Sequence, residues 1–208
     1  MLLYCIRHAE SAFNAEGRIQ GQTDVPLSDF GRRQSEAAAD FLAAMPVEAV
    51  YSSPLGRAYQ TADPIARRLT LPIQTDPRLM EINAGIFQGL LRTEINKQYP
   101  AEIARWASGD PEFQIPGGES RLQLAERGLA VFREIAQSGA RQAVVVSHGG
   151  LIAAALKALL EIPPARHPFV LENCSINRVE IHGDVVRLIS VNQVDHLRGI
   201  GLAGQGDL

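Results

Sequence analysis

Residues 2–11 read LLYCIRHAES, a short apolar run that gives way abruptly to polar side chains. A run of this length and composition predicts a buried strand that ends next to Arg7 and His8. Residues 143–150 read AVVVSHGG and repeat the pattern, with β-branched residues followed by a serine and His148. The sequence thus predicts two buried strands, each with a histidine close to its carboxyl end.

Helical patterns and short strands alternate along the rest of the chain. Ser28 is a favourable N-cap, and the pair Ser53-Pro54 matches an N-cap followed by proline at the first helical position. Ser120 and Gln123 form a capping-box pattern before the strongest helical segment. The expected helices cover residues 29–45, 54–69, 121–138 and 151–160, with helical patches at 92–99 and 100–107. Further strands are expected at 49–51, 71–74, 176–181 and 185–191, and a loop at 7–26.

This alternation of strands and helices predicts an α/β fold with a mostly parallel sheet. We expect a single domain over residues 1–198, because the chain shows no repeat and no low-complexity linker. The glycine-rich end, residues 199–208, is expected to be a flexible tail.

Length and composition are those of an ordinary globular protein. A chain of 208 residues with 46% hydrophobic residues can form a sizeable core without disulfides or a structural metal. Twenty Lys and Arg against 23 Asp and Glu give a formal charge of −3. The bulk positive charge of a nucleic-acid or membrane-surface binder is therefore missing, and any anion site must concentrate its positive charge locally.

Cysteine usage and apolar runs predict the compartment. The chain has two cysteines, Cys5 and Cys174, and neither belongs to a CxxC pair or a cluster with metal-ligand spacing. The apolar run at 2–6 is far too short for a signal-peptide core or a membrane span. We therefore expect a cytoplasmic protein with reduced thiols.

Basic side chains follow three of the expected strands. Arg7 and His8 follow the first strand, Arg57 comes shortly after the strand at 49–51, and His148 follows the strand at 143–146. Ligands of such sheets bind outside the carboxyl ends of the strands. Arginine presents paired donors to phosphate oxygens, and a neutral imidazole can attack phosphorus. These residues alone predict an anion site and are compatible with phosphoryl transfer.

Several motifs resemble those of the histidine phosphatase superfamily, also called the phosphoglycerate-mutase-like family. The first is RHAES at 7–11, with Asn14 and GRIQG at 17–21. Others follow in the family's order: VPLS at 25–28, YSSPL at 51–55 with Arg57 and Thr61, LMEI at 79–82, GGES at 117–120 and VSHGG at 146–150. The resemblance covers about residues 2–192 and implies a three-layer α/β/α sandwich with a mixed central sheet.

The resemblance also implies a covalent mechanism. His8 matches the family's nucleophile, which forms a phosphohistidine that water then hydrolyses, and Glu81 matches the proton donor to the leaving oxygen. Arg7, Arg57 and His148 match the residues that hold the phosphoryl oxygens. The further positions expected to bind phosphate or substrate are Ser11, Asn14, Gln20, Gly21 and Gly149.

Two features favour the phosphatase branch over the cofactor-dependent mutases that the chain also resembles. The mutases carry a longer insertion with extra basic residues after the matching glutamate, whereas residues 82–117 contain only Arg92, Lys97 and Arg105 as basic side chains. The pair Gly149-Gly150 is typical of phosphatases. The predicted enzyme is a metal-independent phosphatase without a cofactor, acting on a small phosphorylated metabolite, and the branch is compatible with a homodimer.

The substrate and two alternative functions stay open. Ala84 stands where related phosphoserine phosphatases often place a histidine, so phosphoserine, α-ribazole phosphate, sugar phosphates and phosphoglycerates all remain candidates. The leaving-group pocket is expected to come largely from residues 83–118. A cofactor-dependent phosphoglycerate mutase is the first alternative. The second is a phosphate-sensing binding module, which the presence of His8, Glu81 and His148 disfavours.

Overall fold

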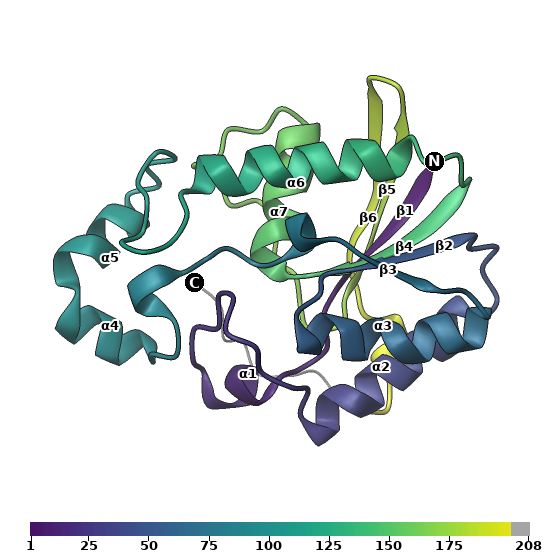
Figure 1. Ribbon diagram of the computed structural model, residues 1–208, viewed down its shortest axis with the longest axis horizontal. Coiled ribbons are helices and arrows are strands. Elements are labelled where there is room, and N and C mark those ends of the chain that lie inside the picture. Colours follow the sequence, from purple (N-terminus) through teal and green to yellow (C-terminus); the bar gives the residue numbers. More distant parts are fainter. Residues whose placement is uncertain (201–208) are drawn as a thin grey trace.

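A six-stranded sheet forms the centre of the part of the chain that the computed structural model describes, residues 1–200 (Figure 1). The strands lie in the order β3-β2-β4-β1-β5-β6. Their bounds are β1 Leu2–Arg7, β2 Ala49–Ser52, β3 Ile73–Thr75, β4 Gln142–Ser147, β5 Ile176–His182 and β6 Val185–Gln193. The first four strands in this order are parallel, and β5 and β6 form an antiparallel hairpin at one edge. The predicted mostly parallel, mixed sheet is confirmed.

Two pairs of helices cover the two faces of the sheet (Figure 1). The helices α2, Asp29–Leu42, and α3, Gly56–Leu69, pack together on one face, and α6, Arg121–Ala136, packs with α7, Gly149–Leu159, on the other. Strand β1 contributes side chains to the hydrophobic core on both faces of the sheet, because alternate side chains of a strand point to opposite faces. This arrangement is the expected three-layer α/β/α sandwich.

The remaining helices lie outside the three layers. Helices α4, Arg92–Gln98, and α5, Pro100–Ala107, confirm the two helical patches and lie beyond one end of the sheet (Figure 1). Short 3-10 turns occur at Pro77–Leu79, Gly85–Phe87 and Asp195–Leu197. Within residues 1–200, no helix is long and apolar enough to cross a membrane.

Side-chain caps explain where two of the main helices begin. Ser28 Oγ accepts the backbone N–H of Gly31 at the start of α2, and Ser120 and Gln123 form the predicted capping box of α6. The predicted start of α3 is wrong by two residues, because its N-cap is Leu55. Ser53 instead faces a histidine of the site described below.

The prediction of a continuous loop over residues 7–26 is also wrong. It contains α1, Ala12–Glu16, which begins with a capping box between Ser11 and Asn14 and ends at Gly17 with φ 72°. A five-residue helix is too short to show a periodic pattern in the sequence. Of the expected tail at 199–208, the backbone N–H of Ile200 bonds to Leu197, while residues 201–208 lie outside the described part.

Candidate active site

The carboxyl ends of β1, β2 and β4 bring four predicted side chains together. Arg7 is the last residue of β1 and His8 follows it, while Arg57 lies in the first turn of α3, after β2. His148 is the N-cap residue of α7, directly after β4. The ring centroids of His8 and His148 are 5.1 Å apart. Two histidines and two arginines therefore meet at one edge of the sheet.

Hydrogen bonds determine which nitrogen of His8 carries the proton. Nδ1 lies 2.7 Å from the carbonyl oxygen of Ala9, which can only accept, so Nδ1 must be protonated. Nε2 accepts a 3.3 Å hydrogen bond from Nε of Arg57, because a guanidinium can only donate. In the neutral ring, the lone pair therefore lies on Nε2.

The charge state of His8 follows from its surroundings. Only 2% of the residue is exposed. Burial, together with the positive charges of Arg57 and Arg7, lowers the pKa of His8 well below its ordinary value of 6.5. The ring is therefore neutral at physiological pH, which is the state that a nitrogen nucleophile requires.

The ring of His148 is fully buried and has a hydrogen-bond partner at Nε2. Ser53 Oγ lies 2.8 Å from Nε2 of His148 and also accepts the backbone N–H of Leu55. In the tautomer in which the Ser53 hydroxyl donates to Nε2, the ring proton lies on Nδ1. Within the described residues, Nδ1 of His148 has no hydrogen-bond partner. A buried donor of this kind suits an oxygen atom of a ligand.

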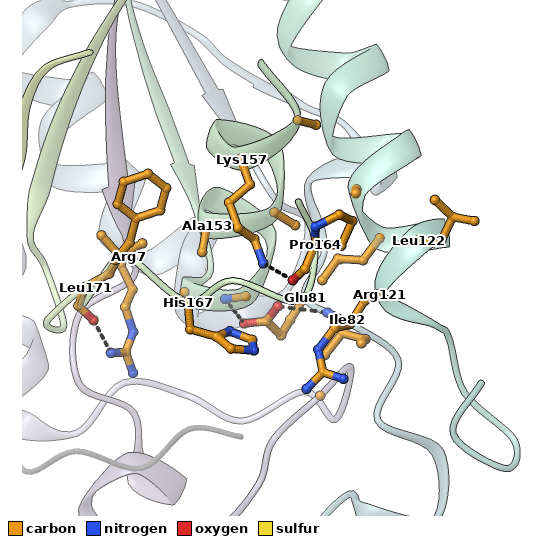
Figure 2. Close-up of a pocket in the computed structure, with 18 of the residues that line it drawn as sticks. Arg7, Glu81, Ile82, Arg121, Leu122, Ala153, Lys157, Pro164, His167 and Leu171 are labelled. Carbon is orange, nitrogen blue, oxygen red and sulfur yellow. Dashed lines mark hydrogen bonds between the residues drawn. The ribbon is translucent and has the colours of Figure 1, made fainter. Parts of the chain in front are cut away.

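Both arginines are fixed by backbone carbonyl groups. Arg57 is fully buried and donates to the carbonyl oxygens of Thr23, at 2.9 Å, and Gly21, at 2.7 Å. Arg7 is 4% exposed and donates to the carbonyl oxygen of Leu171 (Figure 2). Guanidinium groups held in this way are preorganised to bind an anion, because they need little rearrangement when it arrives.

Glu81 approaches the same site from the segment between β3 and α4. Its Oε1 accepts the backbone N–H groups of Ile82, at 2.8 Å, and Leu151, at 3.1 Å, and its Oε2 accepts that of Gly150, at 3.0 Å. Two of these donors belong to the first turn of α7, where the helix dipole favours a carboxylate. A Cβ atom at position 150 would lie 2.5 Å from Oε1, so the carboxylate can come this close only to glycine.

Most of these side chains open into a cavity of about 690 Å³, a size typical of small-molecule sites. The predicted residues that line it are Arg7, His8, Gln20, Gly21, Arg57, Glu81 and Gly149. The predicted residues outside the lining are Ser11, Asn14 and His148. Ser11 and Asn14 are buried in the capping box of α1, and their contact with substrate stays a prediction.

The prediction that residues 83–118 build most of the leaving-group pocket is wrong. Trp106 is the one residue of this segment in the cavity lining. The wall comes instead from α6, α7 and the loop that follows α7 (Figure 2). The physical reason is that α4 and α5 lie beyond the end of the sheet, whereas α7 begins at the site itself and packs against α6.

Three residues that hold parts of the site in place are not among the site residues predicted from the sequence. Ser53 contacts His148, and Thr61 Oγ1 accepts the backbone N–H of Ala9 at 3.0 Å. Asn173 Nδ2 donates to the carbonyl oxygen of His8 at 3.0 Å. Ser53 and Thr61 stand in quoted motifs, which could have marked them. Asn173 stands in no motif, and only the approach of the segment before β5 places it beside β1.

The site is built from basic side chains and backbone N–H donors rather than from a cluster of metal-ligating side chains. Among residues 1–200, no three His, Cys, Asp or Glu side chains gather closely enough to hold a metal ion. Cys5 and Cys174 are both fully buried, and burial raises the pKa of the Cys174 thiol to about 12. Both cysteines therefore behave as core residues rather than as nucleophiles.

A sequence profile of the histidine phosphatase superfamily (branch 1) matches residues 3–194 of the chain. The chain belongs to this superfamily. The match contains every residue of the candidate site and all the strands described above except Leu2, the first residue of β1. The histidine phosphatase assignment therefore confirms the resemblance inferred from the ordered motifs.

The relatives of this chain have names that specify different substrates. A glucosyl-3-phosphoglycerate phosphatase from Mycolicibacterium vanbaalenii is 38% identical, over 80% of this chain and 77% of the relative. A "probable phosphoglycerate mutase" from Proteus mirabilis is 34% identical, over 96% of each chain. The solved structure of an Entamoeba histolytica phosphoserine phosphatase in complex with phosphoserine superposes with a TM-score of 0.85 at 28% identity, covering 94% of this chain and 98% of that one. These relatives support phosphatase activity on a small phosphorylated substrate.

The buried histidines predict how stability depends on pH. Burial and nearby cations hold the pKa of both His8 and His148 well below 6.5. Below pH 6.5 the unfolded chain therefore binds protons that the native state does not, and the free energy of unfolding falls as pH falls. Each histidine contributes up to about 1.4 kcal/mol per pH unit in this window.

Urea denaturation between pH 7 and pH 5 measures this dependence. The variant His148→Asn should show a shallower loss of stability than the wild type, and the matched variant His182→Asn, at the exposed last residue of β5, should keep the full slope. A His148→Asn slope equal to that of the wild type would contradict the buried neutral state of this ring.

Proposed function

We propose that the chain is a metal-independent phosphomonoesterase that hydrolyses a small phosphorylated metabolite through a phosphohistidine on His8. The observation that carries this proposal is the hydrogen bonding of His8. A carbonyl group holds its proton on Nδ1, while Nε2 keeps its lone pair beside the guanidinium of Arg57. This combination supports attack on a phosphoryl group, whose charged oxygens the arginines attract to the nucleophile.

In the first step, the lone pair of His8 Nε2 attacks phosphorus as the bond from phosphorus to the leaving oxygen breaks. Arg7, Arg57 and Nδ1 of His148 donate hydrogen bonds to the three non-bridging oxygens. These donors stabilise the charge of the transferring group, and the loss of one donor of this kind raises a barrier by about 3 kcal/mol. Arg57 must give up its 3.3 Å contact with His8 during this step.

Glu81 serves as the general acid in this proposal and then as the general base. It gives a proton to the leaving oxygen in the first step. In the second step it takes a proton from the water that attacks the phosphohistidine, and the bond between phosphorus and Nε2 breaks. Oε1 accepts two backbone N–H groups and Oε2 accepts one, so Oε2 keeps a second lone-pair site that can take the proton.

The segment after Glu81 favours hydrolysis over the mutase reaction. The mutases carry extra basic residues in this segment, and none of Arg92, Lys97 or Arg105 lines the cavity. We keep the mutase as the alternative because several relatives, including the one from Proteus mirabilis, carry that name. The proposal places the enzyme in the cytoplasm and needs neither a cofactor nor a partner chain for the chemical steps.

Removal of the proposed nucleophile tests the mechanism. His8→Ala should lower the rate of phosphate release from p-nitrophenyl phosphate by roughly 10⁴-fold or more, because no other group can form the intermediate. The wild type should keep its full rate in excess chelator, and His182→Ala should behave as the wild type. Chelator-sensitive turnover, or substantial activity in His8→Ala, would contradict the proposal. Faster interconversion of 2- and 3-phosphoglycerate, with a bisphosphate primer, than hydrolysis would establish the mutase instead.

The role of Glu81 predicts a dependence on the leaving group. Glu81→Gln should lower kcat/KM for alkyl phosphates by roughly 10²-fold or more and for p-nitrophenyl phosphate far less, because only an alkoxide needs a proton as it departs. The measurement is kcat/KM over a series of phosphate esters with leaving groups of different pKa. Equal losses for all esters would argue against proton donation by this carboxyl group.

The close approach of Gly150 to Glu81 predicts opposite effects on activity and stability. Gly150→Ala should displace the Glu81 carboxyl group and lower kcat for alkyl phosphates by roughly 10-fold to 100-fold. The same substitution should leave the free energy of unfolding unchanged or raise it by up to about 1 kcal/mol, since alanine favours a helix. In a Glu81→Gln background it should have little further effect on kcat. An equal loss in both backgrounds would show that it acts elsewhere.

A further inference from the structure

One wall of the cavity carries three basic side chains that the proposed chemistry does not use. They are Arg121 at the start of α6, Lys157 on α7, and His167 in the loop after α7, and we refer to them as the basic cluster. Figure 2 shows Arg7 and Arg121 on opposite sides of the cavity, with Lys157 and His167 between them. The basic cluster therefore lines the same cavity as Arg7.

Neutral groups hold the two permanent cations of the basic cluster in place. Arg121 donates to the carbonyl oxygen of Trp106 at 2.7 Å and stacks on its ring, with Cζ 3.5 Å from the ring centroid. Lys157 Nζ donates to the carbonyl oxygens of Pro164, at 2.8 Å, and Arg166, at 3.1 Å. Within residues 1–200, neither side chain forms an ion pair with a carboxylate.

The cations of the basic cluster also repel one another. Arg121 is 9% exposed and Lys157 is 8% exposed. Burial lowers the pKa of Lys157, and the charge of Arg121 lowers it further. Burial lowers the pKa of Arg121 as well, although Asp110 acts in the opposite direction. The pKa of His167 falls through burial and through the charges of Lys157 and Arg121.

A purely structural role does not explain this arrangement. Carbonyl oxygens can be satisfied by neutral donors, whereas burying two like charges near each other costs free energy unless an anion lies close to both. Much of the surrounding wall is apolar, with side chains such as Leu122 and Phe169. The carboxylates that also line the cavity, Glu81 and Glu126, form no ion pair with either permanent cation of the basic cluster within the described residues. The compensating charge is therefore expected on the ligand.

We propose that the basic cluster is a subsite for a second anionic group, a carboxylate or a phosphate, on the leaving-group part of the substrate. This inference rests on the proposed phosphatase function, since it takes the site around His8 as the place of the scissile phosphate. The substrate class is then a phosphate monoester with a partly apolar or neutral body and a negative charge at its other end. The cluster sets which phosphate esters are preferred, because both cations contact the part of the substrate that does not react.

The test compares matched substrates of increasing length. One series consists of ω-phosphooxy-alkanoates, a second of the corresponding primary amides, and a third of linear alkanediol bisphosphates. The wild type should prefer the best anionic substrate over its neutral match by roughly 10-fold to 100-fold in kcat/KM, as expected for charge-assisted hydrogen bonds. The preferred series identifies the anion as carboxylate or phosphate.

Variants separate a binding subsite from a structural clamp. Arg121→Gln and Lys157→Gln should each reduce the preference for the anion, mainly through a higher KM for the anionic substrate, and Lys157→Arg should restore most of it. Arg133→Gln removes an exposed cation on the same helix α6 and should leave the preference unchanged. Equal losses for the anionic and neutral substrates, or no preference in the wild type, would overturn the inference.

Calorimetric binding to His8→Ala distinguishes a failure of this inference from a failure of the proposed mechanism. This variant should bind the anionic ester more tightly than its amide, and the difference should disappear in His8→Ala/Lys157→Gln/Arg121→Gln. A lasting binding preference without wild-type hydrolysis would refute the phosphatase proposal alone. Hydrolysis of both substrate types without a binding preference would refute the subsite alone.

Discussion

The parallel pairing of β1 with β4 is the constraint on which the site depends. Arg7 lies opposite Ser147 in this register, and the backbone N–H of His8 donates to the carbonyl oxygen of Ser147 at 2.8 Å. The pairing thereby places His8 beside His148, although the two come from opposite parts of the chain. A slip of one residue in either strand would turn every side chain to the opposite face and separate the two rings.

One set of charges contributes to two properties of the site. Burial is the main cause of the low pKa of His8, and the guanidinium groups that are suited to phosphoryl oxygens lower this pKa further. The charges that attract the anion therefore also help to keep the imidazole neutral. The formal charge of −3 for the whole chain does not reveal this local concentration of positive charge. Backbone carbonyl groups accept hydrogen bonds from Arg57 and Arg7 and thereby fix the direction of both guanidinium groups.

Much of the fold could be predicted from the sequence because its signals are local. The apolar run before Arg7, the cap at Ser28 and the capping box at Ser120 each act within a few residues, and all three are confirmed. The pocket wall could not be predicted, because it depends on the packing of α6 against α7 on one face of the sheet. Asn173 shows the same limit, since its contact with His8 joins residues from opposite ends of the chain.

The central position of β1 has a consequence for how the chain folds. Both neighbours of this first strand come late in the sequence, since Leu2 pairs with Gln142 on one side and with Glu180 on the other. During synthesis, β1 cannot complete its pairing until both β4 and β5 have been made. Closing such long loops is entropically costly. The topology therefore has a high contact order, which is typical of slow folding. Catalytic competence is then acquired only when almost the whole chain has emerged from the ribosome.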